Sequence, residues 1–106
     1  MWSYETMVAN RDLLSKAISI ARAVENHFHH RFDMQYSFEM PNYNYKDIKN
    51  PRDVEVLYAR VYKDISYCLY LSDILRASRS QLEKELLIEE IVESIKDNME
   101  LYDYEW

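Results

Sequence analysis

The chain has 106 residues, 48% apolar and 30% charged, which is typical of one globular domain with one hydrophobic core. We therefore expect a single domain over residues 1–106. The formal net charge of −6 argues against direct binding to nucleic acid, which needs lysine and arginine contacts to phosphate, and the absence of glycine excludes phosphate-cradling and dinucleotide-binding loops.

The first predicted element is a helix over residues 4–31, which contain neither glycine nor proline. Ser3 precedes it and is a suitable N-cap residue. Apolar side chains recur at helical spacing along two neighbouring seams and give the helix a broad apolar face. The seams consist of Leu14, Ile18, Ala21, Phe28 and Phe32, and of Leu13, Ala17, Ile20 and Val24.

Residues 33–50 interrupt the helical pattern. Apolar and polar residues alternate over 34–40, which is strand spacing, and Pro41-Asn42 suits the centre of a turn. Since two strands alone are marginally stable in water, we expect either a short β-hairpin or an extended loop over the helices. The segment combines tyrosine with serine and asparagine, as adaptable binding loops do. Its candidate contact residues are Tyr36, Tyr43 and Tyr45.

The central element is predicted to be a helix over residues 51–79, because Asn50 followed by Pro51 is typical of a helix N-terminus. Two apolar seams run along opposite sides of it, so neighbouring helices must enclose it or one seam must contact a partner. The first seam is Val54, Tyr58, Val61, Ile65, Cys68, Ser72 and Leu75, and the second is Val56, Tyr67, Tyr70 and Ile74.

A third helix is predicted from residue 81 to about residue 102, because Ser80 and Glu83 have the spacing of a capping box. A short turn at residues 78–80 would reverse the chain between the second and third helices. The alternative is one unbroken helix from residue 51 to about residue 102, since Leu82 and Leu86 continue the first seam of the central helix in phase.

These elements predict an all-α fold. A long antiparallel helical hairpin and a third helix would form a three-helix bundle, with an extended or short β-hairpin-like insertion at about residues 33–50.

The expected compartment is the cytoplasm, with no contact to a membrane. Cys68 is the only cysteine, so it cannot form an intrachain disulfide, and no signal peptide or membrane-spanning run occurs. Residues with AT-rich codons are abundant: Phe, Tyr, Met, Ile, Asn and Lys number 38, against 15 for Gly, Ala, Arg and Pro. This bias indicates an AT-rich genome, such as that of a phage or a low-GC bacterium.

The first candidate for a chemical site is the cluster of Glu25, His27, His29, His30 and Asp33. Residues three or four apart share a helix face, so pairs from this cluster could ligate a metal. We favour a structural role, because the later helices contain no histidine for a second ligand pair and because a helix C-terminus favours positive charge. The sequence therefore predicts no metal site and no cofactor.

Arg22 and His27, separated by four residues, resemble the Arg-x4-6-His motif of the HEPN ribonucleases, an all-helical family. The resemblance covers six residues and implies a catalytic pair at a dimer interface. On an uninterrupted helix, however, residues five apart point about 140° away from one another.

The last predicted helix carries the strongest charge asymmetry. Residues 81–106 hold nine acids and two bases, a net charge of −7. Like charges four residues apart destabilise a helix, so this ridge is either a solvated face or a docking surface for a basic partner. The ridge residues are Glu89, Glu93, Asp97 and Glu100, opposite the apolar stripe of Ile88, Ile91, Ile95, Met99 and Tyr102.

The leading hypothesis is a small acidic, non-enzymatic protein that binds and inhibits another protein with a basic, nucleic-acid-handling surface, as phage counter-defence proteins do. Its partner-binding residues would be those of the ridge and the three tyrosines of residues 33–50. The second hypothesis is a HEPN-like ribonuclease or a metal-binding enzyme that uses Arg22, Glu25, His27, His29 and His30. The third is a homodimer formed through the second seam of the central helix.

Overall fold

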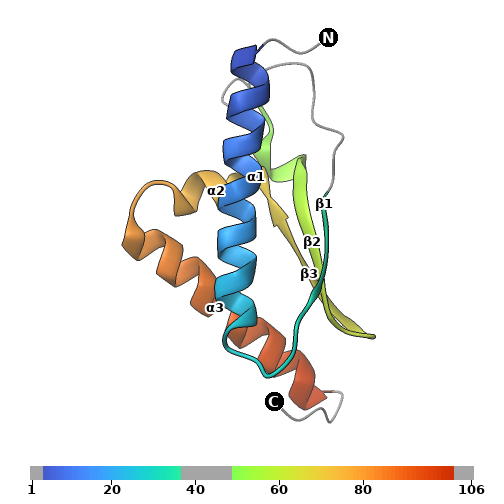
Figure 1. The fold of residues 1–106 in the computed structure, drawn as a ribbon. Coiled ribbons are helices and arrows are strands. Elements are labelled where there is room, and N and C mark those ends of the chain that lie inside the picture. The colour runs from blue at the N-terminus through green and yellow to red at the C-terminus, as the bar shows by residue number, and fades with distance from the viewer. Residues whose placement is uncertain (1–3, 37–48, 102–106) are drawn as a thin grey trace.

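The computed structural model describes residues 4–36 and 49–101, in which a three-stranded antiparallel sheet accompanies three α-helices (Figure 1). The fold is therefore mixed α/β, and the all-α prediction is wrong. In chain order the elements are α1 (Tyr4–Glu25), β1 (Asp33–Tyr36), the 3-10 helix η2 (Pro51–Asp53), β2 (Glu55–Tyr62), β3 (Ile65–Tyr70), α2 (Leu71–Ala77) and α3 (Gln81–Leu101).

The sheet has β2 at its centre, with β1 on one side and β3 on the other. Strands β2 and β3 form a hairpin in which Tyr62 pairs with Ile65 across the turn and Leu57 pairs with Leu69. The register shifts between Glu55 and Leu57 and again between Arg60 and Tyr62. Such irregularities bend a strand and change which side chains face the core.

The hairpin replaces the predicted central helix over residues 51–79, and the alternative of one helix from residue 51 to about 102 is wrong as well. Residues 54–70 are rich in β-branched and aromatic side chains, which favour strands. Four buried residues of the hairpin nevertheless recur every four positions: Leu57, Val61, Ile65 and Leu69. This spacing also fits a helix, so the periodicity alone was misleading.

The second seam of the predicted central helix, on which the homodimer hypothesis rests, does not exist as one surface, because the hairpin replaces that helix. Val56, Tyr67, Tyr70 and Ile74 lie on three different elements rather than on one helix face. Val56 and Ile74 are buried in the core, so neither is available to a second copy.

Helix α1 has the predicted apolar face but ends at Glu25 rather than near residue 31. The Glu25 carboxylate accepts a hydrogen bond from the backbone N–H of Phe32 at 2.8 Å. This bond ties the turn after the helix to the start of β1. A strand forms at residues 33–36, as the spacing over 34–40 indicates, but its partner is β2 rather than a second strand within residues 33–50; the pairs run from Asp33–Arg60 to Tyr36–Leu57. The predicted turn at Pro41-Asn42 lies outside the described residues.

Helix α3 begins at Gln81, as predicted. The Ser80 hydroxyl accepts a hydrogen bond from the backbone N–H of Glu83 at 3.1 Å, which is the N-cap contact that the sequence indicates. The break between the second and third helices is therefore confirmed.

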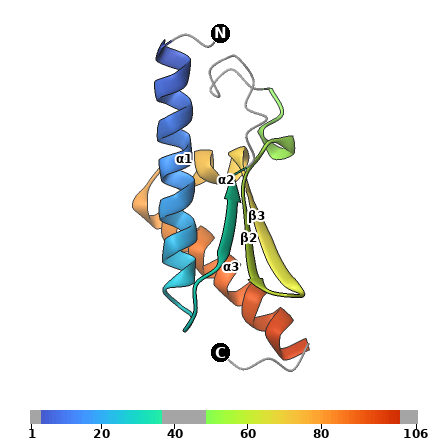
Figure 2. The same cartoon turned by 45° about the vertical axis from the view of Figure 1, so that its right-hand side comes forward.

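The three helices lie on one side of the sheet, and the core fills the space between these layers (Figures 1 and 2). The opposite face of the sheet carries the cross-strand row of Gln35, Tyr58 and Cys68, all at least partly exposed. The largest fully buried side chains are Leu13, Ile20, Val24, Leu57, Leu69, Leu71, Ile74, Ile95 and Met99.

Candidate interaction surface

The acidic ridge of α3 faces away from the core. All four carboxylates are exposed, and at about 100° per residue they occupy an arc of about 80° on the helix. The opposite side holds Leu87, Ile88, Val92, Ile95 and Met99, which are buried. Three members of the predicted apolar stripe are thus buried and Ile91 is half-buried, while Tyr102 lies outside the described residues.

Two leucines extend the ridge toward the start of α3. Leu82 and Leu86 are 64% and 39% exposed and lie on the same side of the helix as the carboxylates. Leu86 lines a shallow hollow together with ridge residues Glu89, Glu93 and Asp97. The sequence pattern had assigned both leucines to an apolar seam. They are exposed instead, because the packing of α3 on α1 and β3 turns other residues of the helix toward the core. The surface thus combines apolar anchors with a line of negative charge.

The ridge carboxylates are not neutralised by neighbours. Within the described part of the chain, none of Glu89, Glu93, Asp97 and Glu100 forms a salt bridge. Like charges this close raise the free energy of the folded helix, so the ridge does not exist to stabilise α3.

The adjacent Glu90 behaves differently, because Arg76 of α2 contacts it. The Arg76 guanidinium donates to both oxygens of Glu90, at 2.7 and 3.2 Å, and its Nε donates to Glu83 at 2.9 Å. The hydrogen bond from Arg76 lowers the pKa of Glu90. Arg76 therefore fastens α2 to α3 beside the ridge and compensates a charge there.

Of the three tyrosines predicted to contact the partner, Tyr36 is described by the structure, and it does not join the ridge. Tyr36 is 43% exposed and ends β1, the edge strand opposite β3, whereas α3 packs against β3 and α1. Tyr43 and Tyr45 lie outside the described residues. The ridge and Tyr36 are therefore separate candidate contacts.

Two members of the histidine cluster, His30 and Glu25, make structural contacts. His30 Nε2 donates to the Val61 carbonyl at 2.6 Å, and its ring lies 4.5 Å from the Tyr62 ring. The Glu25 carboxylate accepts a hydrogen bond from the Phe32 backbone N–H. Within residues 4–36 and 49–101, no group of three or more histidine, cysteine or acidic side chains is placed to hold a metal.

The structure brings part of the second candidate set together. Arg22, Glu25, His29 and His30 line one open cavity of about 510 Å³, but His27 is not among its lining residues. Arg22 and His27 thus do not share this cavity, and the mixed α/β fold differs from the all-helical architecture that the HEPN resemblance implies.

Among the described residues, the Tyr67 hydroxyl is buried and has no hydrogen-bond partner. Burial, and then the charge of Glu25, raise the pKa of Tyr67. The phenol therefore stays protonated across the physiological pH range.

Comparison with protein family models, with curated proteins and with solved structures found no match to this chain. Among the described helices, none combines the length and the apolar character that crossing a bilayer requires. The function must therefore be argued from the surface itself.

Proposed function

We propose that this protein is a small acidic interaction protein that binds another protein through the ridge of α3 and inhibits it. The observation that carries the proposal is the set of four aligned, exposed carboxylates without a salt bridge in the described structure. In this proposal the protein acts in the cytoplasm, by binding rather than by catalysis.

The geometry of the ridge favours a partner that normally holds nucleic acid. From Glu89 to Glu100 the helix rises about 16.5 Å, so the mean spacing of the four charges along the axis is about 5.5 Å. One strand of DNA carries a negative charge every ~3.4 Å of helix axis. The ridge thus offers a basic groove a short line of negative charge, at a wider spacing than that of one DNA strand. A protein that occupies such a groove excludes the nucleic acid, as expected of a phage counter-defence inhibitor.

The exposed leucines would set how long the complex lasts. Charge speeds association, whereas apolar side chains desolvated at an interface mainly slow dissociation. Leu82 and Leu86 continue the ridge along the same side of α3, so one partner surface can contact both features.

The test compares two double charge reversals. Glu93→Lys with Asp97→Lys removes the middle of the ridge, and Asp33→Lys with Glu55→Lys makes the same change at exposed sites on β1 and β2. Each pair changes the net charge from −6 to −2, because each substitution adds two positive charges. The partner is captured from the native host with the wild-type chain, purified, and measured by stopped-flow against all three proteins.

We expect the ridge reversal to slow association by about tenfold or more at low salt. The effect should be much smaller near 0.5 M salt, where charges are screened beyond about 4 Å. The control reversal should change the rate by less than about threefold. The wild-type chain should also displace nucleic acid from the partner. Equal effects of the two reversals, or a complex that still holds its nucleic acid, would contradict the proposal.

A further inference from the structure

A second surface of the molecule has the opposite charge. An open cleft of about 690 Å³ lies between η2 and α2, with the start of α3 beyond Arg76. Four cationic residues and two acids line it, which gives the lining a formal charge of +2 in a chain whose net charge is −6. The cations are Lys49, Arg52, Arg76 and Arg79.

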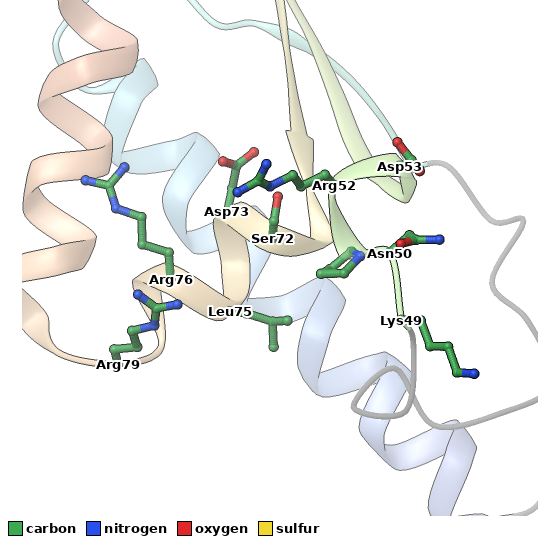
Figure 3. Close-up of a pocket in the computed structure, with 10 residues that line it drawn as sticks. Lys49, Asn50, Arg52, Asp53, Ser72, Asp73, Leu75, Arg76 and Arg79 are labelled. Atoms are coloured by element: carbon green, nitrogen blue, oxygen red, sulfur yellow. The ribbon is translucent and has the colours of Figure 1, made fainter.

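Arg52 and Arg79 lie at opposite ends of the cleft (Figure 3). Figure 3 shows Arg52 extending from η2 toward Ser72 and Asp73, whereas Arg76 and Arg79 lie at the other end of α2 and Leu75 projects from a different side of that helix. Lys49 points away from the other cations in this view. The lining thus offers a guanidinium from η2, others from the end of α2, the Ser72 hydroxyl and the apolar side chain of Leu75.

The cationic charge in the cleft is only partly neutralised. Arg76 is bonded to Glu83 and Glu90, and the Asp73 carboxylate accepts the Tyr70 backbone N–H at 2.9 Å. Arg52 and Arg79 form no salt bridge with an acid in the described residues, although the chain contains 19 acids. Two exposed guanidinium groups therefore remain available to an anion.

We propose that this cleft binds a small organic polyphosphate of nucleotide size. Guanidinium groups bind phosphate through two parallel hydrogen bonds, and two of them at opposite ends favour a ligand with more than one phosphate. The cleft volume falls within the range of small-molecule sites, about 300 to 1,000 Å³. Ser72 supplies a hydrogen-bond donor, and Leu75 supplies apolar surface for a non-phosphate portion.

A small ligand is favoured over a nucleic acid strand because of what surrounds the cleft. Charges farther away than about 8 Å are screened at physiological ionic strength, so a ligand confined to the cleft responds mainly to its cations. A longer strand would pass over α3, where Glu83 and Glu90 adjoin Arg76 and the ridge follows. Those carboxylates would repel it.

The test uses ATP without metal as the probe, titrated into the full chain by calorimetry at about 50 mM salt, with adenosine as the uncharged comparison. Arg52→Gln with Arg79→Gln is the cleft variant. Arg22→Gln with Arg31→Gln is the matched control, since both are exposed and line the separate cavity near the histidines. All four substitutions are at exposed positions, and circular dichroism checks that each variant is folded.

We expect one ATP per chain, at least tenfold weaker binding to the cleft variant, less than threefold change in the control variant, and no binding of adenosine. Amide chemical shifts of the wild-type chain should change mainly at residues 49–53 and 72–79. Absence of binding at millimolar ATP would overturn the proposal, as would equal weakening in both variants. Tighter binding of a single-stranded oligonucleotide through the same arginines would replace the small ligand with nucleic acid.

Discussion

Replacing Leu69 and Cys68 separately by alanine tests the hairpin directly, because these neighbours on β3 face opposite sides of the sheet. Leu69 is fully buried opposite Leu57, whereas Cys68 lies on the sheet face opposite the helices and is half-buried. A helical central element would reverse their roles, since its seam contains Cys68 and neither of its seams contains Leu69. The β-hairpin therefore predicts the larger loss of stability for Leu69→Ala, and a central helix predicts the larger loss for Cys68→Ala.

The magnitude follows from the burial of Leu69. Leu69→Ala removes three carbon groups, which at about 0.8 kcal/mol each is roughly 2.4 kcal/mol of lost transfer free energy. A residual cavity of up to about 60 Å³ adds up to about 1.4 kcal/mol at roughly 24 cal/mol per Å³. We expect Leu69→Ala to lower the free energy of unfolding by about 2.5 to 4 kcal/mol. Cys68→Ala removes one half-exposed sulfur, and we expect a loss of about 1 kcal/mol or less.

Urea denaturation followed by far-ultraviolet circular dichroism measures both changes, and an unchanged m-value shows that the unfolding transition is comparable. Ser66→Ala, at an exposed position of the same strand, is the control and should change stability by less than about 0.5 kcal/mol. If Cys68→Ala costs as much as Leu69→Ala, the assignment of faces to β3 is wrong.

Two further predictions concern ionisable side chains. Because Arg76 lowers the pKa of Glu90, their contact stabilises the fold above the unfolded pKa of about 4.3 and is lost as the pH falls through the lower folded value. Glu90→Gln should therefore be less stable than the wild type at pH 7, and the two urea midpoints should converge toward pH 3. His30→Gln should lower the free energy of unfolding by about 1 to 2 kcal/mol, because it disrupts a hydrogen bond and a ring contact. The exposed His29→Gln should change it by less than about 0.5 kcal/mol, and equal effects would contradict the structural role of His30.

The helices at the two ends of the chain could be predicted because their signals are local. The apolar face of α1 repeats with a single period, and the Ser80–Glu83 spacing marks the start of α3 within the chain segment that forms it. The C-terminus of α1 could not be placed, since it depends on the Glu25 contact with Phe32, seven residues away.

The hairpin could not be recognised from periodicity, because a row with strand spacing also contains a four-residue spacing. Leu57, Ala59 and Val61 are buried at every second position of β2, and the four-residue step from Leu57 to Val61 fits a helix as well. Composition was the better signal: residues 54–62 and 65–70 are rich in valine, isoleucine and tyrosine, and the polar pair Lys63-Asp64 separates them. The turn between β2 and β3 was not recognised because Lys63-Asp64 contains neither glycine nor asparagine, one of which is usual in two-residue hairpin turns.

The acidic ridge and the cationic cleft also differ in how far the sequence could predict them. The acidic ridge needs only a correct α3, so the sequence was enough to identify its carboxylates. The cleft needs residues 49–53 beside residues 72–79, and that meeting follows from the hairpin, which pairs Glu55 with Tyr70 and bonds the Leu71 N–H to the Val54 carbonyl at 2.8 Å. A continuous helix over 51–79 would instead have separated Arg52 from Arg79 by about 40 Å.

The distribution of charge connects these two surfaces. Arg76 is the one cation of the cleft lining that is bonded to acids in the described structure, and its partners Glu83 and Glu90 belong to α3 beside the ridge. Pairing at this boundary leaves unpaired carboxylates on one side and unpaired guanidinium groups on the other. A fold selected for stability alone gains from interspersing opposite charges, and separation keeps each surface available to a ligand of opposite sign. The ridge and cleft variants alter different elements, so either surface can lose binding while the other retains it.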